Sequence, residues 1–157
     1  MVTLTPMTKE QFEAYLERSI PKYAAENVRA GYWSEEEALE KSRRDFERLL
    51  PDGVETKGHL LFQIIHAETN AQIGILWLNA RTDTPRPSGF IYDIELDEAF
   101  RGKGFGRQTM LAVEEKAREL GLKSIGLHVF AHNTAAKELY LKAGYQIKSY
   151  NMVKDLD

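Results

Sequence analysis

The chain has 157 residues, 43% hydrophobic and 29% charged, which is typical of one globular domain with its own core. Its net charge of −3 argues against general nucleic-acid binding, which needs a basic surface, and fits a cationic substrate slightly better than an anionic one. No apolar run reaches the roughly 18 residues of a membrane span, and no signal peptide is evident. The absence of cysteine excludes disulfides, thiolate metal sites and a cysteine nucleophile. We therefore expect a cytoplasmic protein without nucleic-acid or membrane partners.

The N-terminal part of the chain predicts a short strand followed by two helices. Residues 2–6 favour the strand. Thr8 begins a helical pattern of apolar residues, with Glu10 and Gln11 as capping partners in the first turn. Ser34 and Glu37 have the spacing of a capping box, which predicts the start of the second helix.

From residue 59 onward the hydrophobic pattern changes to that of strands. Residues 59–66 and 72–80 are β-rich and flank a short polar turn, so they predict a hairpin. Further strands are expected at 89–96, 123–130 and 145–154.

Two helices separate the last three of these strands. Residues 104–120 and 134–143 have helical patterns, and Gly121 and Gly144 follow them as expected C-terminal caps. Alternation of strand and helix implies parallel pairing through a right-handed crossover, whereas the hairpin is antiparallel. The sequence therefore predicts an α/β fold with a mixed sheet.

The segment EAFRGKGFGRQ, residues 98–108, places three glycines and three basic residues between a predicted strand and a predicted helix. A helix N-terminus offers unpaired N–H groups and a partial positive charge, and glycines let a phosphate approach those groups closely. We interpret this segment as a site for a pyrophosphate. The residues concerned are Arg101, Gly102, Lys103, Gly104, Phe105, Gly106 and Arg107.

The glycine spacing excludes the commoner phosphate-binding motifs. A P-loop requires G-x-x-x-x-G-K-[ST], in which Lys103 would be misplaced. A dinucleotide fingerprint, G-x-G-x-x-G, would need its third glycine at Arg107 or at Thr109. Taken alone, the segment could also be a flexible turn with solvated basic residues.

A second motif follows at residues 133–145, NTAAKELYLKAGY, with the pattern N-x-x-A-x-x-L-Y-x-x-x-G-Y. Together with R-x-x-G-x-G at residues 101–106 and a strand before each motif, it resembles the GNAT family of N-acetyltransferases. The resemblance covers residues 60–154 and, more loosely, the N-terminal helices. It implies a mixed sheet of six or seven strands flanked by about four helices.

The resemblance also implies a function and a division of the chain. GNAT enzymes move the acetyl group of acetyl-CoA to an amine, so acetyl-CoA is the expected co-substrate and an amine, small or on a peptide or protein, the expected acceptor. The whole chain, 1–157, would be a single acetyltransferase domain. Residues 1–58 would shape the acceptor site, and residues 59–154 would form the acetyl-CoA-binding core.

The family's functional positions map onto this sequence residue by residue. Residues 101–106 would bind the pyrophosphate, and the preceding strand would bind the pantetheine arm through its backbone. In the second motif Asn133 would contact the cofactor and Tyr140 would protonate the leaving thiolate. The remaining positions assigned to cofactor binding are Ile94, Glu95, Leu96 and Ala136.

The chemistry of acetyl transfer requires an acid and a base. An alkyl ammonium, with a pKa near ~10.4, must lose a proton before attack, and the thiol that leaves has a pKa near ~8.5. Without cysteine, direct attack in a ternary complex is the simplest route. Tyr140 has the chemistry of a proton donor, although a core aromatic would give the same pattern.

Three residues are candidates for the base. His128 lies at the end of the predicted strand 123–130, where an ordinary hydrogen-bonded histidine is an equal alternative. Asp93 and Glu95 alternate on one face of the strand 89–96 and could raise one another's pKa, unless that face is simply solvated or a bulge disturbs the alternation. The pair His128 and His132 spans a strand end and a loop, so it predicts no metal site.

The acceptor and the oligomeric state are less constrained. Residues 20–35 and 81–88 should line the acceptor cleft, where aromatic and acidic side chains either hold an ammonium group or pack the two helices together. Those side chains are Tyr23, Glu26, Tyr32 and Trp33. A homodimer formed through an exposed edge strand is compatible with the resemblance. The alternative function is a non-catalytic acyl-CoA-binding sensor with the same fold.

Overall fold

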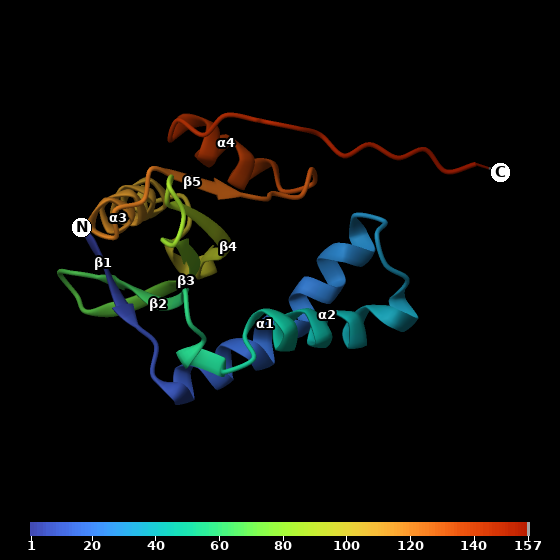
Figure 1. Ribbon diagram of the computed structural model, residues 1–157, viewed down its shortest axis with the longest axis horizontal. Helices are drawn as coiled ribbons and strands as arrows, with labels where there is room; N and C mark the ends of the chain where they lie inside the picture. The colour runs from blue at the N-terminus through green and yellow to red at the C-terminus, as the bar shows by residue number, and fades with distance from the viewer. Residues whose placement is uncertain (157) are drawn as a thin grey trace.

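The computed structural model describes residues 1–156. They form one mixed sheet with helices on both faces (Figure 1). The strands are β1 (Val2–Pro6), β2 (His59–His66), β3 (Ala71–Arg81), β4 (Ser88–Leu96) and β5 (Ser124–Leu127). The helices are α1 (Lys9–Arg29), α2 (Glu35–Leu49), α3 (Phe105–Glu119) and α4 (Thr134–Lys142), with 3₁₀ turns η1 (Gly53–Glu55) and η2 (Glu98–Phe100). None of the helices within residues 1–156 has the length and apolar character needed to cross a membrane.

The sheet has the order β1-β2-β3-β4-β5. The first three pairings are antiparallel and β4 pairs with β5 in parallel, so the expected mixed sheet is confirmed. The parallel pair is connected through α3, as a strand–helix–strand unit requires.

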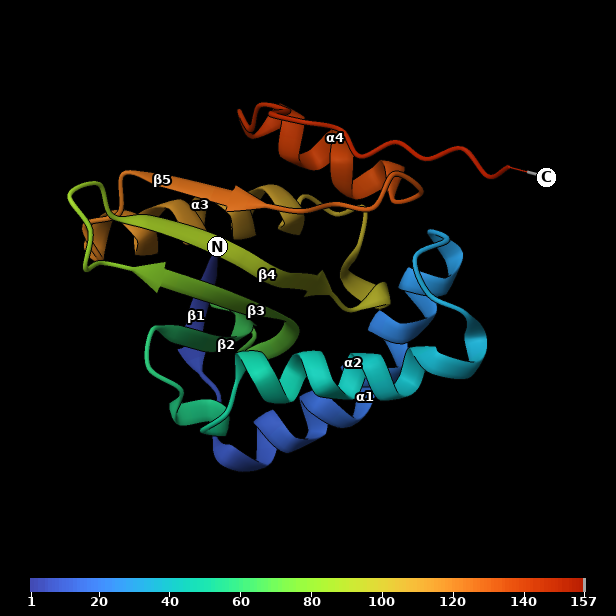
Figure 2. The ribbon, with the colours of Figure 1, turned by 45° about the vertical axis from the view of Figure 1, so that its right-hand side comes forward.

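Helices cover the two faces of the sheet unequally. Helices α1 and α2 lie on one face and α3 on the other (Figure 2). Alternate residues of β3 therefore enter two cores: Ile75 and Trp77 pack toward α1 and α2, whereas Leu76 and Leu78 pack toward α3. Tyr15 of α1 belongs to the first core, which brings a hydroxyl group into the interior.

The two predicted helix starts differ in their caps. At α1 the Thr8 hydroxyl accepts from the Gln11 backbone N–H, and the Gln11 side chain accepts from the Thr8 N–H, so the predicted capping box forms. At α2 the Ser34 hydroxyl instead donates to the Glu37 carboxylate at 2.9 Å. The box expected there is absent, although the helix starts as predicted.

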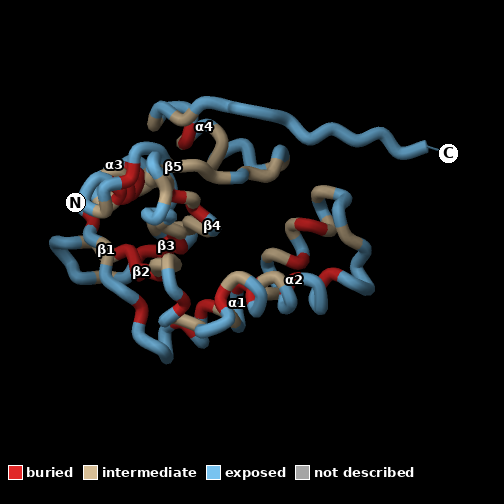
Figure 3. The backbone as a smooth tube through the Cα atoms, in the orientation of Figure 1, coloured by how far each residue is buried: buried red, intermediate tan, exposed pale blue. Residues whose placement is uncertain are grey.

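The C-terminal strand expected at 145–154 does not form, and the sheet therefore has five strands within residues 1–156 rather than six or seven. A strand needs a neighbour to satisfy its backbone N–H and C=O groups. After Tyr145, whose N–H donates to the Tyr140 carbonyl, the chain runs away from the sheet and is exposed (Figure 3). The composition of this segment suits a strand, but it pairs with none of the described strands.

We expect Leu76→Ala to lower the free energy of unfolding by about 2–5 kcal/mol, because Leu76 is fully buried in β3 and the substitution leaves a cavity. Chemical denaturation followed by circular dichroism would measure it. Leu111→Ala is the matched control, since Leu111 is 56% exposed on α3 and should change stability by less than about 0.5 kcal/mol. Equal losses in the two variants would contradict the placement of the core.

Candidate functional site

A bulge in β4 determines which side chains reach the candidate site. Trp77 of β3 is opposite Asp93, whereas Leu78 is opposite Ile91, so Tyr92 is an extra residue in the strand. Tyr92 stacks on Trp77 with ring centroids 4.8 Å apart, and Asp93 faces α1 as well. The bulge thus places two consecutive side chains on the face covered by α1 and α2.

Beyond the bulge, β4 and β5 separate. They pair only from Ser88–Ser124 to Ile91–Leu127, although β4 continues to Leu96. β5 also ends earlier than the expected 123–130. On the side facing β5, the backbone of Ile94, Glu95 and Leu96 therefore has no strand partner within residues 1–156.

Asp93 is the carboxyl group at the inner end of this opening. Tyr15 of α1 donates a hydrogen bond of 2.6 Å to its Oδ2 atom, across a separation of 78 residues in the chain. Burial raises the pKa of Asp93 to about 6, while the Tyr15 hydrogen bond lowers it and the charge of Glu95 raises it further. The residue as a whole keeps partial exposure.

Tyr140 lies near Asp93 although it comes from α4. Its side chain is only 9% exposed, and burial, together with the negative charge of Asp93, raises the pKa of its hydroxyl to about 12. The phenol is consequently protonated throughout the physiological range, which is the state of a proton donor. The structure thus brings together an acidic group with a raised pKa and a neutral phenol.

Glu95 lies on the same face as Asp93, but it is ion-paired. Its Oε1 atom is 2.6 Å from Nζ of Lys22 in α1 and 3.6 Å from a terminal nitrogen of Arg101. Arg101 also donates from Nε to the Leu96 carbonyl at 2.9 Å. The Arg101 side chain is therefore turned back onto the end of β4.

The glycine segment forms the turn from η2 into α3. Gly102 and Gly104 have φ angles of 71° and 84°, and a Cβ atom on either would meet no neighbour within 4 Å. Gly106 is in the first turn of α3, where a Cβ atom would approach Leu139 of α4 to 3.1 Å. Lys103 and Arg107 are exposed, whereas Phe105 is partly buried. This leaves the first backbone N–H groups of α3 beside an open, basic surface.

His128 and Asn133, which follow β5, contact other residues of their own loop and of α4 in this structure. His128 is exposed one residue after β5 ends, with its ring 5.1 Å from that of Phe130. Asn133 is the N-cap of α4, and its side-chain oxygen accepts from the Ala136 N–H at 3.3 Å. Asn133 is itself exposed, so it stays accessible from solvent.

A pocket of about 300 Å³ connects α1 with the loop before α4. Lys22, Glu26 and Arg29 line it from α1, and His132 and Asn133 line it from the loop. Burial raises the pKa of Glu26, and the positive charge of Lys22 partly offsets that effect. This pocket lies next to Glu95, the ion-pair partner of Lys22, at the opening of β4.

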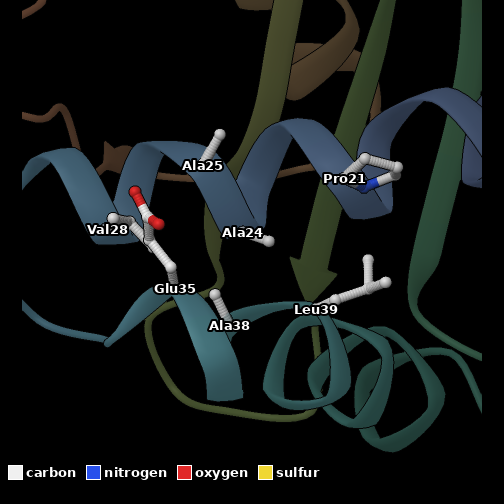
Figure 4. Close-up of a pocket in the computed structure, with 7 residues that line it drawn as sticks. All are labelled: Pro21, Ala24, Ala25, Val28, Glu35, Ala38 and Leu39. Carbon is white, nitrogen blue, oxygen red and sulfur yellow. The ribbon is translucent and has the colours of Figure 1, made fainter.

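A second groove, between α1 and α2, is mostly apolar (Figure 4). It has a volume of about 370 Å³, and Glu35 is its only ionisable residue. The aromatic residues expected near the acceptor mainly pack the two helices: the rings of Tyr23 and Trp33 are 5.5 Å apart, and Tyr23 also meets Phe46 at 5.9 Å. Tyr32 differs, since it is exposed and faces Phe130 at 6.5 Å.

Two residues of the site were not identified from the sequence as functional. Tyr15 has the spacing of an ordinary apolar position on α1, and Lys22 that of a solvated surface residue. Both contact β4 residues more than 70 positions later in the chain. No local pattern contains such a signal, because the contacts exist only once α1 is docked on the sheet.

Known proteins are similar to this chain over its full length. The acetyltransferase (GNAT) family matches residues 22–145. The uncharacterized N-acetyltransferase YdgE of Bacillus subtilis is 41% identical over 154 residues, 98% of each chain. The crystal structure of the putative acetyltransferase YycN from Bacillus subtilis superposes with a TM-score of 0.95 at 40% identity, covering 99% of both chains.

More distant curated relatives match about half of this chain. A mycothiol acetyltransferase of Propionibacterium freudenreichii is 33% identical over 82 residues, which are 52% of this chain and 26% of that protein. The match over residues 22–145 and the relatives that cover nearly the whole chain agree with the fold. The chain belongs to the GNAT family of acetyltransferases.

Proposed function

We propose that this protein transfers the acetyl group of acetyl-CoA to a primary amine by direct attack within a ternary complex. The observation that carries the proposal is that Asp93, a carboxyl group with a raised pKa, lies near Tyr140, a protonated phenol, where β4 and β5 separate. An acid and a base near one another at an open strand edge are what aminolysis of a thioester requires.

The opening also fits the elongated shape of acetyl-CoA. The unpaired backbone of Ile94–Leu96 offers N–H and C=O groups to the amides of the pantetheine arm. The N-terminus of α3, with Gly102 and Gly104 leaving free space and Lys103 and Arg107 exposed, suits the pyrophosphate. Arg101 would have to leave the Leu96 carbonyl to join that site.

Asp93 is the base that the geometry favours among the three candidates. At neutral pH a carboxyl group with a pKa of about 6 is largely ionised, yet it is a better base than an ordinary aspartate. Glu95 is ion-paired with Lys22 and Arg101, which fits a role in positioning rather than proton transfer. His128 is exposed and would have to act through water.

The proposed reaction proceeds in one transfer. Asp93 removes a proton from the acceptor ammonium, directly or through water, and the free amine attacks the thioester carbon. The new C–N bond forms as the C–S bond breaks, and Tyr140 gives its proton to the sulfur that leaves. The pKa of about 12 keeps the phenol protonated until the thiolate develops beside it.

A thiol-release assay with acetyl-CoA and a panel of small amines, polyamines and peptides tests this proposal. It should be run beside calorimetric titration of acetyl-CoA alone. Turnover with one class of acceptor supports the enzyme. Binding without turnover across the panel favours the alternative, an acyl-CoA sensor, and absence of binding contradicts both.

Gly104→Glu should abolish detectable acetyl-CoA binding in calorimetry, because a carboxylate would occupy the anion site at the start of α3. Gly121→Glu is the matched control: Gly121 has a similar φ of 77°, also with no neighbour within 4 Å of a Cβ atom, but follows the other end of α3. The control should retain binding. Tight binding by Gly104→Glu would rule out this phosphate site.

Tyr140→Phe should lower kcat by about 10²-fold with little change in acetyl-CoA affinity, because the substitution removes only the donated proton. Steady-state kinetics and calorimetry separate the two quantities. Tyr145→Phe is a suitable control, since this neighbouring tyrosine also has a pKa raised to about 12 by burial, yet lies beside Glu114. A normal kcat in Tyr140→Phe would exclude the acid role.

The pH dependence of kcat/KM should show an acid limb near pH 6, with activity falling as Asp93 becomes protonated. Tyr15→Phe should move this limb to higher pH, because the lost hydrogen bond had lowered the pKa of Asp93. Tyr23→Phe, on the same helix but directed toward Trp33, should leave the limb in place. An acid limb that Tyr15→Phe does not move would argue against Asp93 as the base.

The raised pKa of Asp93 also makes the stability of the folded protein depend on pH. Asp93 keeps its proton to a higher pH in the folded protein than in the unfolded chain. The stability of the folded protein is therefore greatest, as far as Asp93 is concerned, below about pH 4, and it falls as the pH rises through about 6. Asp93→Asn should therefore unfold at a higher temperature than the parent at pH 7.5, with the difference vanishing near pH 4. The same variant should lose activity by about 10²-fold or more.

A further inference from the structure

Lys22 of α1 brings a primary amine of the protein itself into the candidate site. Its Nζ atom is 2.6 Å from Oε1 of Glu95, and its side chain is 43% exposed. The other ion-paired lysines of α2 and α3 contact acidic residues of their own helix, whereas Lys22 contacts a strand more than 70 residues later in the chain. Its amine therefore lies over β4, where the proposed acceptor amine has to arrive.

The charge of Lys22 acts on the proposed base as well as on Glu95. Burial raises the pKa of Asp93 and of Glu26, and the positive charge of Lys22 lowers both. Asp93 and Glu95 are two residues apart on the same face of β4, a separation of roughly 7 Å along a strand. The amine of Lys22 is thus surrounded by carboxyl groups, and one of them is the group assigned to remove a proton.

The Lys22 side chain is free to move along the strand from Glu95 toward Asp93. A lysine ammonium sits on a flexible four-carbon stem, so it can exchange one carboxylate for another without movement of the backbone. On its other side Lys22 lines the pocket that it shares with His132 and Asn133, so this movement has open space. The position of the amine is therefore adjustable within the site.

We propose that Lys22 is itself an acceptor, and that with acetyl-CoA bound the protein transfers an acetyl group to the Nζ atom of its own Lys22. This inference rests on the proposed acetyl transfer, because it uses the same co-substrate, base and acid. A nucleophile already held in the site has an effective concentration far above that of a free amine in solution.

The step balances with acetyl-CoA as the only co-reactant. Asp93 takes a proton from the ammonium group of Lys22, and the neutral nitrogen attacks the thioester carbon. The C–N bond forms and the C–S bond breaks, and the electron pair stays on sulfur, which takes a proton from Tyr140. The nitrogen loses its second proton as the amide forms. That proton restores the Tyr140 phenol through water, and Asp93 releases its own to solvent.

Acetylation changes the contacts of Glu95. The modified Lys22 carries no charge, so the ion pair with Glu95 is lost, and the contact of Glu95 with Arg101 at 3.6 Å remains. An amide nitrogen is not a nucleophile under these conditions. The reaction therefore stops after one acetyl group at Lys22 in each chain.

Peptide mass spectrometry after incubation of the full-length protein with acetyl-CoA, without an added amine, tests the proposal. Lys41 of α2 is the matched internal control, because it is 48% exposed and ion-paired with Glu37, yet is not among the charges that shift the pKa of Asp93. Lys22 should be acetylated at least about 10-fold faster than Lys41. Equal rates at the two lysines would mean unassisted chemical acetylation and would overturn the proposal.

Asp93→Asn separates transfer by the site from chemical acetylation. It should slow modification of Lys22 by about 10²-fold and leave the slow modification of Lys41 unchanged, because only Lys22 uses the base. An acetyl group found on Lys22 of the parent as purified supports the proposal if Asp93→Asn, purified in the same way, lacks it. Lys22 acetylated equally in both proteins contradicts the proposal. Thermal melting shows that the variant is folded.

Dilution tests whether the transfer occurs within one chain. At saturating acetyl-CoA, the first-order rate constant for modification of Lys22 should stay the same over about a 20-fold range of protein concentration, because the amine and the site belong to the same molecule. A rate constant that rises in proportion to protein concentration would show transfer between copies and would overturn the proposal.

Failure of this inference is distinguishable from failure of the proposed function. If acetyl-CoA binds in calorimetry and an added amine is acetylated while Lys22 stays unmodified, the inference is wrong and the proposed function stands. If acetyl-CoA does not bind and neither Lys22 nor any added amine is acetylated, both are wrong.

Discussion

The separation of β4 from β5 after Ile91 is the constraint on which the rest of the site depends. Continued pairing would use the backbone groups of Ile94–Leu96, which lie beside Asp93 on the same strand. The bulge at Tyr92 accompanies this separation and directs Asp93 toward α1. A local irregularity of one residue therefore creates both the open strand edge and the polar group beside it.

Because Asp93 faces α1, the packing of that helix on the sheet determines the pKa of the Asp93 carboxyl group. Burial under α1 raises its pKa, and the hydroxyl of Tyr15 limits the rise by donating a hydrogen bond. Lys22, two turns further along α1, forms an ion pair with Glu95. The helix that covers the sheet thus gives different partners to two carboxyl groups that look equivalent along the strand. A buried carboxyl group lowers the stability of the folded protein at neutral pH. Such destabilising groups are common at functional sites.

The C-terminal segment also depends on neighbouring elements, because it forms no strand where no strand pairs with it. Its residues have strand propensity, but a strand cannot exist without a second strand to pair with. α4 leads the chain past β5 and the segment leaves the molecule with its apolar side chains exposed.

The amino-acid sequence alone determined the order of the elements, the hairpin, the helix caps at Thr8 and Gly121, and the family, because these follow from periodicity and motifs over short stretches. It also placed Asp93, Glu95 and Tyr140 among the candidates for the site. It could not decide whether Asp93 or Glu95 is the better candidate for the base. It also could not identify Tyr15 and Lys22, because the contacts of these two residues join α1 to β4 across the fold. Nor could it show that residues 145–154 leave the sheet. Local propensity acts within a few residues, whereas burial, ion pairing and strand partners are set only by tertiary structure.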